Sequence, residues 1–264
     1  MVRAGRLRWR STVGWSDSAC PLPEAALVVD SFLASEGGVR DLAEHEDRFR
    51  RGCRVLDLPV AGLDGFLAAA RAELPPRGRW FPRFEAHADG ALVFWVREAP
   101  AQGREVRLWN PQAPDPRRHP TVKGPDLALL ADLRKQAAEW DADDALLTGA
   151  GGVVLEASHS ALLWWRGEGL EVPDPALPLL PSVTARRLLR MARAGSVPVT
   201  ARRCRPDELA GTEVWTVNAL HGIRPVVGWR CGGPSLAEPD RARLERFRAH
   251  LALPGAPARH RPCR

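Results

Sequence analysis

The chain has 264 residues, of which 45% are hydrophobic and 27% charged, a composition typical of globular rather than disordered proteins. No stretch reaches the roughly 18 apolar residues of a membrane helix, and no apolar segment follows the basic N-terminus as in a secretory signal, so we expect a cytoplasmic protein without a membrane partner. The net charge is +6, but the arginines are spread over the whole chain, which argues against nucleic-acid binding.

The first part of the chain predicts strands and helices that form an antiparallel sheet covered by helices. An apolar run over Ala26–Leu33 predicts a strand, and helical spacing predicts helices over Leu42–Arg54 and Leu63–Leu74. Two further strands are predicted over Trp80–Glu85 and Ala91–Arg97.

A proline-rich segment over Asn110–Pro120 predicts a linker between two domains. We place an N-terminal α/β domain at residues 1–118, with the interdomain linker at about 110–120, and a C-terminal α/β domain at residues 121–264. The predicted fold class is α+β in both halves.

The second half again mixes helices and strands. Its predicted helices are Asp126–Trp140, Ser182–Ala194 and Asp240–Leu251. Its predicted strands are Ala145–Thr148, Val153–Glu156, Ala161–Trp165, Val197–Arg203 and Glu213–Asn218. Alternation along a strand predicts that one of Trp164 and Trp165 faces the core and the other the surface, and we expect Trp215 in the core.

The cysteines and histidines form no pattern typical of a metal site, and we predict none. The five cysteines contain no Cys-x-x-Cys pair and are odd in number, so reduced thiols are expected. They are Cys20, Cys53, Cys204, Cys231 and Cys263.

Lys123 is notable because the chain has only one other lysine, Lys135, among 38 basic residues. An ammonium group can lose its proton and form a Schiff base, whereas a guanidinium stays protonated. The count alone leaves open whether Lys123 was retained for such chemistry or by chance.

The order of motifs around Lys123 is similar to that of a known family. The matching segments are His45-Glu-Asp-Arg48-Phe49, Thr121-Val-Lys123, Asp143-Asp-Ala-Leu-Leu, Gly152-Val-Val-Leu-Glu156, Leu180-Pro-Ser-Val-Thr184 and Glu213-Val-Trp-Thr-Val-Asn218-Ala-Leu with Pro225-Val226. In this order and spacing, over roughly residues 26 to 230, the chain resembles the class IV aminotransferases, the fold type IV enzymes that use pyridoxal phosphate. This family includes branched-chain and D-amino-acid aminotransferases and aminodeoxychorismate lyase.

The resemblance implies a two-domain fold type IV architecture, like that of D-amino-acid aminotransferase, with pyridoxal 5'-phosphate bound by the C-terminal domain. It implies a Schiff base on Lys123 and a phosphate contact from Arg48. Glu156 would keep the ring nitrogen protonated, which electron-sink chemistry requires. Val183 and Thr184 would hold the phosphate at a helix N-terminus. The alternatives are a strand-end position for Glu156 and a simple N-cap for Thr184.

Further expectations concern the remaining cofactor contacts and the substrate. Asn218 and Ala219 correspond to a second phosphate-contacting turn, where Ala219 would offer only its backbone amide. Arg83 and Arg97 are candidates to bind a substrate carboxylate, and the alternative for each, which the large number of arginines favours, is a surface residue. Family members usually form homodimers, so the resemblance also implies a homodimer.

Three departures from the family pattern keep the reaction open. They are Ala161, where an asparagine is usual, and Ser182 and Ala185, which flank the Val183-Thr184 pair. We expect an aminodeoxychorismate lyase-like enzyme that eliminates pyruvate to give 4-aminobenzoate, with Lys123 as the proton shuttle. The alternatives are an aminotransferase acting on an amino acid and keto acid pair, and a degenerate, non-catalytic relative.

Overall fold

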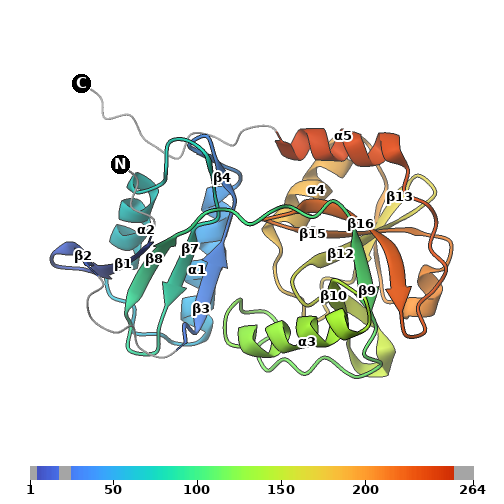
Figure 1. Cartoon of the computed structure of the whole chain (residues 1–264), viewed down its shortest axis with the longest axis horizontal. Coiled ribbons are helices and arrows are strands. Elements are labelled where there is room, and N and C mark those ends of the chain that lie inside the picture. The colour runs from blue at the N-terminus through green and yellow to red at the C-terminus, as the bar shows by residue number, and fades with distance from the viewer. Residues whose placement is uncertain (1–4, 18–24, 253–264) are drawn as a thin grey trace. The chain divides into compact units, whose positions relative to one another are not determined.

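The computed structural model describes residues 5–17 and 25–252, which form two compact units (Figure 1). The first unit contains residues 5–17 and 25–101 together with Val122–Pro125. The second contains Gln102–Thr121 and Asp126–Ala252. Lys123 therefore belongs to the first unit, although the segments before and after Val122–Pro125 belong to the second.

An antiparallel sheet of five strands forms the centre of the first unit. In spatial order its strands are β2 (Gly14–Asp17), β1 (Gly5–Arg10), β8 (Leu92–Val96), β7 (Arg83–Ala86) and β3 (Val28–Ser31). The last three confirm predicted strands. The β1–β2 hairpin was not predicted, because the three arginines of β1 give this segment a basic composition that obscures its alternation with apolar residues.

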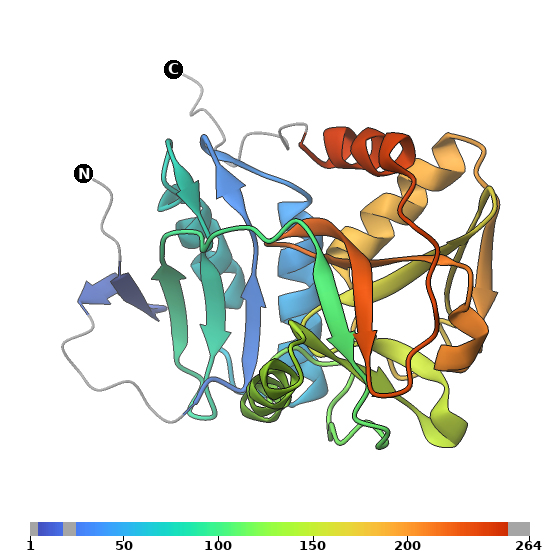
Figure 2. The ribbon, with the colours of Figure 1, turned by 45° about the vertical axis from the view of Figure 1, so that its right-hand side comes forward.

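Two helices cover one face of this sheet and confirm the predicted helices of the first part. They are α1 (Leu42–Val55) and α2 (Leu63–Ala72), drawn beside the strands in Figure 2. Phe49 of α1 and Phe66 of α2 pack with Phe84 and Phe94 of the sheet in one buried cluster. A smaller three-stranded sheet in this unit consists of β4 (Ala34–Ser35), β5 (Gly38–Val39) and β6 (Arg79–Trp80).

The second unit is built on a mixed sheet of eight strands. In spatial order these are β11 (Val154–Ala157), β10 (Asp144–Thr148), β9 (Val106–Trp109), β16 (Gly222–Arg230), β15 (Glu213–Asn218), β12 (Ala161–Arg166), β13 (Gly169–Pro173) and β14 (Val199–Arg202). β9 runs parallel to both of its neighbours, and β13 runs parallel to β14. Strands β9, β13 and β16 were not predicted.

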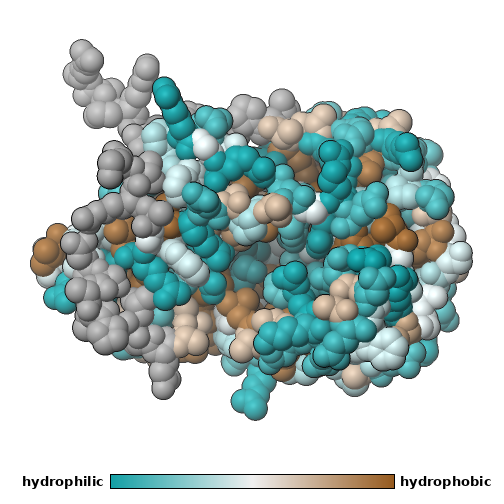
Figure 3. Space-filling view, viewed as in Figure 1, coloured by the Kyte–Doolittle hydropathy of each residue, from teal (hydrophilic) through white to brown (hydrophobic). Residues whose placement is uncertain are grey.

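Three α-helices of the second unit confirm the predicted ones within a few residues. They are α3 (Leu127–Glu139), α4 (Val183–Ala194) and α5 (Arg241–Ala252), and two short 3-10 helices, Ala150–Gly152 and Pro206–Leu209, lie in loops. Helix α3 buries only Ala137, and Figure 3 shows a mostly hydrophilic surface where Figure 1 draws this helix. No helix of the described ranges is long and apolar enough to cross a membrane.

The eight-stranded sheet is buried on both faces near β12. Trp164 lies in a cluster with Leu108 and Val226, whereas Trp165 faces the opposite side and meets Trp215 and helix α5. The expectation that one of the two adjacent tryptophans faces the surface was therefore wrong, because helices α4 and α5 cover the sheet face on which Trp165 lies. Trp215 is in the core, as predicted.

Candidate functional site

The segment that contains Lys123 lies along the free edge of β3. The backbone N–H of Val29 donates to the carbonyl oxygen of Lys123 at 2.8 Å, and Val122 is buried in the core of the first unit. Gly124 lies so close to the strand that a Cβ on it would be 2.1 Å from the carbonyl oxygen of Leu27. Because its φ is also +151°, only glycine fits here, and the backbone is fixed on both sides of the lysine.

Helix α1 directs two side chains at Asp30 on β3. Arg48 donates from Nε and Nη2 to the two carboxylate oxygens of Asp30, at 2.7 and 2.9 Å, and His45 Nδ1 lies 2.7 Å from Asp30 Oδ1. Although burial disfavours the charge, Arg48 and His45 hold the pKa of Asp30 at about 2. Arg48 thus has two of its three guanidinium nitrogens on Asp30, and its contact with a cofactor phosphate stays a prediction.

Arg83 and Arg97 belong to a cluster on the face of the first sheet opposite its aromatic core. This basic cluster also contains Arg6, and we define it by these three arginines. The guanidinium groups of Arg6 and Arg97 lie 4.5 and 4.7 Å from the ring centre of Trp95. Cation–π contacts of this kind hold both groups against the sheet.

The basic cluster has an excess of positive charge. Arg83 and Arg6 share the carboxylate of Glu85, at 3.3 and 3.8 Å, while Arg97 donates to the carbonyl oxygen of Phe81 at 2.9 Å. Burial lowers the pKa of Arg83 and of Arg97, and neighbouring arginines lower both further. Three guanidinium groups with one shared carboxylate can accept an anionic ligand.

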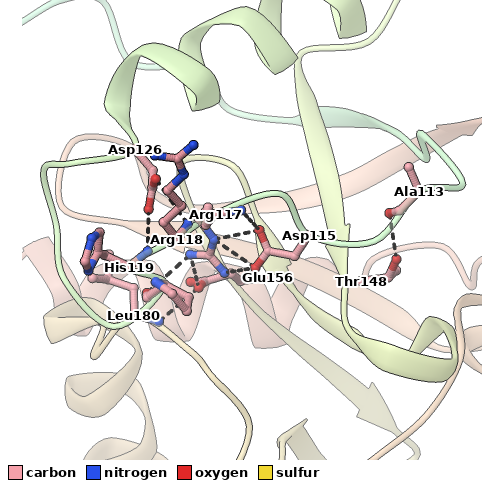
Figure 4. Close-up of polar contacts among 10 residues, drawn as sticks. Ala113, Asp115, Arg117, Arg118, His119, Asp126, Thr148, Glu156 and Leu180 are labelled. Carbon is pink, nitrogen blue, oxygen red and sulfur yellow. Dashed lines mark hydrogen bonds and ion pairs between the residues drawn. The ribbon is translucent and has the colours of Figure 1, made fainter.

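Glu156 on β11 is buried and lies at the centre of a polar network in the second unit. Its Oε1 atom accepts hydrogen bonds from Arg117 Nη1 at 2.7 Å and from the backbone N–H of Leu180 at 2.9 Å (Figure 4). Burial raises the pKa of Glu156, and the charge of Arg117 partly offsets that effect. A strand-end position exposed to water, the alternative for this residue, is excluded because its side chain is only 6% exposed.

Helix α4 begins at Val183, three residues after Leu180, so its N-terminus lies close along the chain to the contact with Glu156. Ser182 is the N-cap, and its Oγ atom accepts from the N–H of Ala185 at 3.2 Å. The N–H groups of Val183 and Thr184 lie in the first turn, where a helix provides no backbone acceptors for them. Thr184 is therefore not the cap residue, and both amides have the location that phosphate binding requires.

Asn218 closes the turn between β15 and β16. Its Nδ2 atom donates to Ser160 Oγ at 3.0 Å, and its Oδ1 atom accepts from the N–H groups of Leu220 and His221 at 3.1 and 2.7 Å. This side chain shapes the turn that presents Ala219. The predicted roles of both residues toward the cofactor stay predictions.

The predicted site residues are thus divided between the units. Arg48, Arg83, Arg97 and Lys123 lie in the first, and Glu156, Val183, Thr184, Asn218 and Ala219 lie in the second. No cluster of described residues has the composition of a metal site.

Sequence reasoning missed the residues that hold these side chains in place. They are Arg6, Asp30, Asp115 and Arg117. The alternation of Arg6 with apolar residues in a strand was the available signal for that residue. Arg117 had no signal, because its partner Glu156 is 39 residues away.

The sequence model of the family described as amino-transferase class IV matches residues 27–229. The protein belongs to the class IV aminotransferases. Enzymes of this family use pyridoxal phosphate, so the predicted enzyme class and cofactor are confirmed. The search of the curated proteins found no match to this chain.

Solved structures confirm the fold type IV architecture of this class IV family member. A branched-chain amino acid aminotransferase from T.th., complexed with N-(5'-phosphopyridoxyl)-L-glutamate, has a TM-score of 0.77 at 19% identity, over 95% of this chain and 94% of that one. An aminotransferase from Brucella abortus bound to PLP has a TM-score of 0.77 at 18% identity, over 94% and 99%. A proposed 4-amino-4-deoxychorismate lyase from Legionella pneumophila has a TM-score of 0.74 at 17% identity, over 89% and 96%.

The second unit of this class IV enzyme fits the cofactor of its family. Glu156 Oε2 accepts no hydrogen bond from any residue in the described ranges, so it can receive a ring N–H. Asp115, Arg117 and Glu156 together have two carboxylates and one guanidinium, an excess of one negative charge that a protonated ring nitrogen balances. The first turn of α4 offers amides to the phosphate.

Proposed function

We propose that this class IV enzyme is a lyase similar to aminodeoxychorismate lyase, which converts 4-amino-4-deoxychorismate into 4-aminobenzoate and pyruvate. The observation that carries the proposal is the basic cluster, where Arg6 and Arg83 share the carboxylate of Glu85 and Arg97 donates to a backbone carbonyl oxygen, which leaves an excess of positive charge. The substrate has two carboxylates, one on the ring and one on the enolpyruvyl group, and an excess of guanidinium groups suits such a dianion. Because the basic cluster and Lys123 belong to the same unit, one body would hold the substrate and the reactive amine.

The chemistry assigns each side chain a separate task. Pyridoxal phosphate, when bound, supplies an electron sink for the carbanion at the reacting carbon. Lys123 is the amine that holds the cofactor and then accepts the ring proton of the substrate. As that proton leaves, the ether C–O bond breaks, the enolate of pyruvate departs with the oxygen and the ring becomes aromatic. The enolate then takes up one proton on carbon to give pyruvate, which balances the proton removed from the ring. Glu156 would hold the proton on the cofactor ring nitrogen, and the α4 amides would bind the phosphate.

An aminotransferase is the second candidate, and the same basic cluster supports it. A dicarboxylate amino donor such as glutamate would also use two guanidinium contacts, and the similar branched-chain aminotransferase structure contains a glutamate adduct. A homodimer and a cytoplasmic location stay predictions from the resemblance and the composition.

The test compares the products formed by the purified protein with added pyridoxal phosphate. We expect pyruvate and 4-aminobenzoate in equal amounts from 4-amino-4-deoxychorismate, without any keto acid added. Amino transfer from glutamate to a keto acid, with no pyruvate released, would instead establish the aminotransferase.

A pair of lysine variants tests the assignment of the reactive amine. Lys123→Ala should lose both the visible absorbance band of lysine-bound cofactor and the activity. Lys135→Ala is the matched control, because that side chain is 77% exposed and, among the described residues, forms an ion pair only with Asp132, one turn earlier in α3. A band that persists in Lys123→Ala would refute the role of Lys123.

A further inference from the structure

Arg117 uses all three guanidinium nitrogens inside the second unit. Its Nε and Nη2 atoms contact the carboxylate of Asp115, at 3.0 and 2.7 Å, and its Nη1 atom contacts Glu156 Oε1 at 2.7 Å. Nη1 also lies 3.4 Å from the carbonyl oxygen of Pro120. Figure 4 shows Arg117 between the two carboxylates, and its side chain is only 5% exposed. A guanidinium in this setting cannot turn away from Glu156 without leaving Asp115.

The loop that contains Arg117 is itself fastened to the sheet. The backbone N–H of Asp115 donates to the carbonyl oxygen of Thr148 at 2.7 Å. Thr148 Oγ1 in turn donates to the carbonyl oxygen of Ala113 at 3.2 Å, as Figure 4 shows. On the other side, the N–H of His119 donates to Asp126 at 2.9 Å, just before α3. The loop therefore holds Arg117 at a fixed distance from β11.

This arrangement fixes both the direction and the charge of Glu156. Both of its hydrogen bonds go to Oε1, so the carboxylate cannot rotate freely and Oε2 is left for a ligand. Arg117 lies behind Oε1, where its positive charge favours an ionised Glu156 that faces a protonated ring nitrogen over a neutral acid that faces an unprotonated one. The carboxylate of Asp115 offsets part of the positive charge of Arg117. The three groups together therefore have one net negative charge, which favours a cation next to Glu156.

We propose that Arg117 and Asp115 are positioning residues that keep Glu156 ionised and directed at the ring nitrogen of pyridoxal phosphate. This inference rests on the proposed use of Glu156 toward the cofactor, and it extends that use to a pair of residues that do not touch the cofactor. Arg117 and Asp115 would thereby control whether the ring nitrogen is protonated.

The experiment measures that proton directly, by the nitrogen chemical shift of pyridoxal phosphate labelled with ¹⁵N in the ring and bound to the protein. In the unaltered chain we expect a protonated ring nitrogen at neutral pH. In Arg117→Gln the proton should move to Glu156, and the affinity for the cofactor should fall about tenfold or more. Arg117→Lys keeps the charge and should restore the protonated state with an affinity between the two.

Asp115→Asn tests the role of the Arg117–Asp115 ion pair while keeping the arginine. It is also the variant to use if Arg117→Gln does not fold. This variant adds one net positive charge to the set, so the ring nitrogen should lose its proton at a lower pH than in the unaltered chain. Arg118→Gln is the matched control, because Arg118 is the exposed next residue and only its backbone N–H contacts Asp126. It should leave the chemical shift and the affinity unchanged.

The possible outcomes separate this inference from the proposed function. If Arg117→Gln and Asp115→Asn both titrate like Arg118→Gln, the positioning role is refuted while cofactor binding stands. If the unaltered chain takes up no pyridoxal phosphate, the proposed function fails and the inference fails with it. A change in affinity without any change in ring protonation would show a merely structural role for Arg117 and would also overturn the inference.

Discussion

A methyl group on residue 124 would meet the carbonyl oxygen of Leu27 at 2.1 Å, well inside any allowed contact. Neither side of this contact can move away easily. Leu27 directly precedes β3, and the segment that contains residue 124 is held by Val122, which is buried in the core. The residue next to the reactive lysine therefore decides whether the lysine segment can lie on the strand edge at all.

We predict that Gly124→Ala lowers the free energy of unfolding by about 1–3 kcal/mol, because the substitution adds backbone strain as well as a clash. Urea denaturation measures this change. Gly167→Ala is the control, since that glycine also has a positive φ but no atom within 4 Å of an added Cβ. Equal losses in the two variants would show that φ alone matters and that the close approach to Leu27 does not.

At the scale of an element, helix α4 depends on its N-cap. Ser182 Oγ accepts the N–H of Ala185, and the cap leaves the amides of Val183 and Thr184 for a ligand. We predict that Ser182→Ala lowers the free energy of unfolding by about 1 kcal/mol, and Ser182→Gly by only a few tenths.

Urea denaturation of the cofactor-free protein tests the cap. Ser235→Ala is a suitable control, because Ser235 is exposed and only its backbone carbonyl oxygen is bonded, to Gly211. A loss in Ser182→Ala no larger than that in Ser235→Ala would contradict the role of Ser182.

The helices illustrate what the sequence predicts well. The five α-helices of the described ranges were all expected within a few residues of their observed ends, because amphipathic spacing and capping residues are local signals. The strands were predicted less completely. β1 alternates arginine with apolar residues. β13 and β16 each form a hairpin with the preceding strand, but each also pairs on its other side with a strand that is distant in sequence, and no local pattern contains that second contact.

The residues of the candidate site were likewise predicted only in part. Lys123 and Glu156 were expected from motifs, whereas Asp30 and Arg117 were not. Each of these two is an ion-pair partner of a predicted residue, and each pairs across 18 or 39 positions of the chain. Motifs therefore identified side chains assigned to the cofactor, and the side chains that hold them were found only in the structure.

At the scale of the whole molecule, acid should act on the two units in opposite directions. In the first unit, burial disfavours the charge of Asp30, but Arg48 and His45 outweigh it and lower its pKa from the ordinary value of 3.8 to about 2. A carboxyl with a depressed pKa stabilises the folded state above its unfolded pKa and loses that contribution as the pH falls through the folded pKa. In the second unit, burial raises the pKa of Glu156, so protonation of this residue on mild acidification relieves a cost of folding.

We therefore predict that stability falls by about 2 kcal/mol between about pH 4 and pH 2 because of Asp30. Urea denaturation of the cofactor-free protein at a series of pH values measures this slope. Asp30→Asn should flatten the loss of stability below about pH 4. Glu156→Gln should leave that loss unchanged and should instead remove the gain in stability that protonation of Glu156 gives on mild acidification. If Asp30→Asn retains the slope of the unaltered chain, the fall must come from other carboxylates, and the ion pair with Arg48 would not be what keeps the first unit folded in acid.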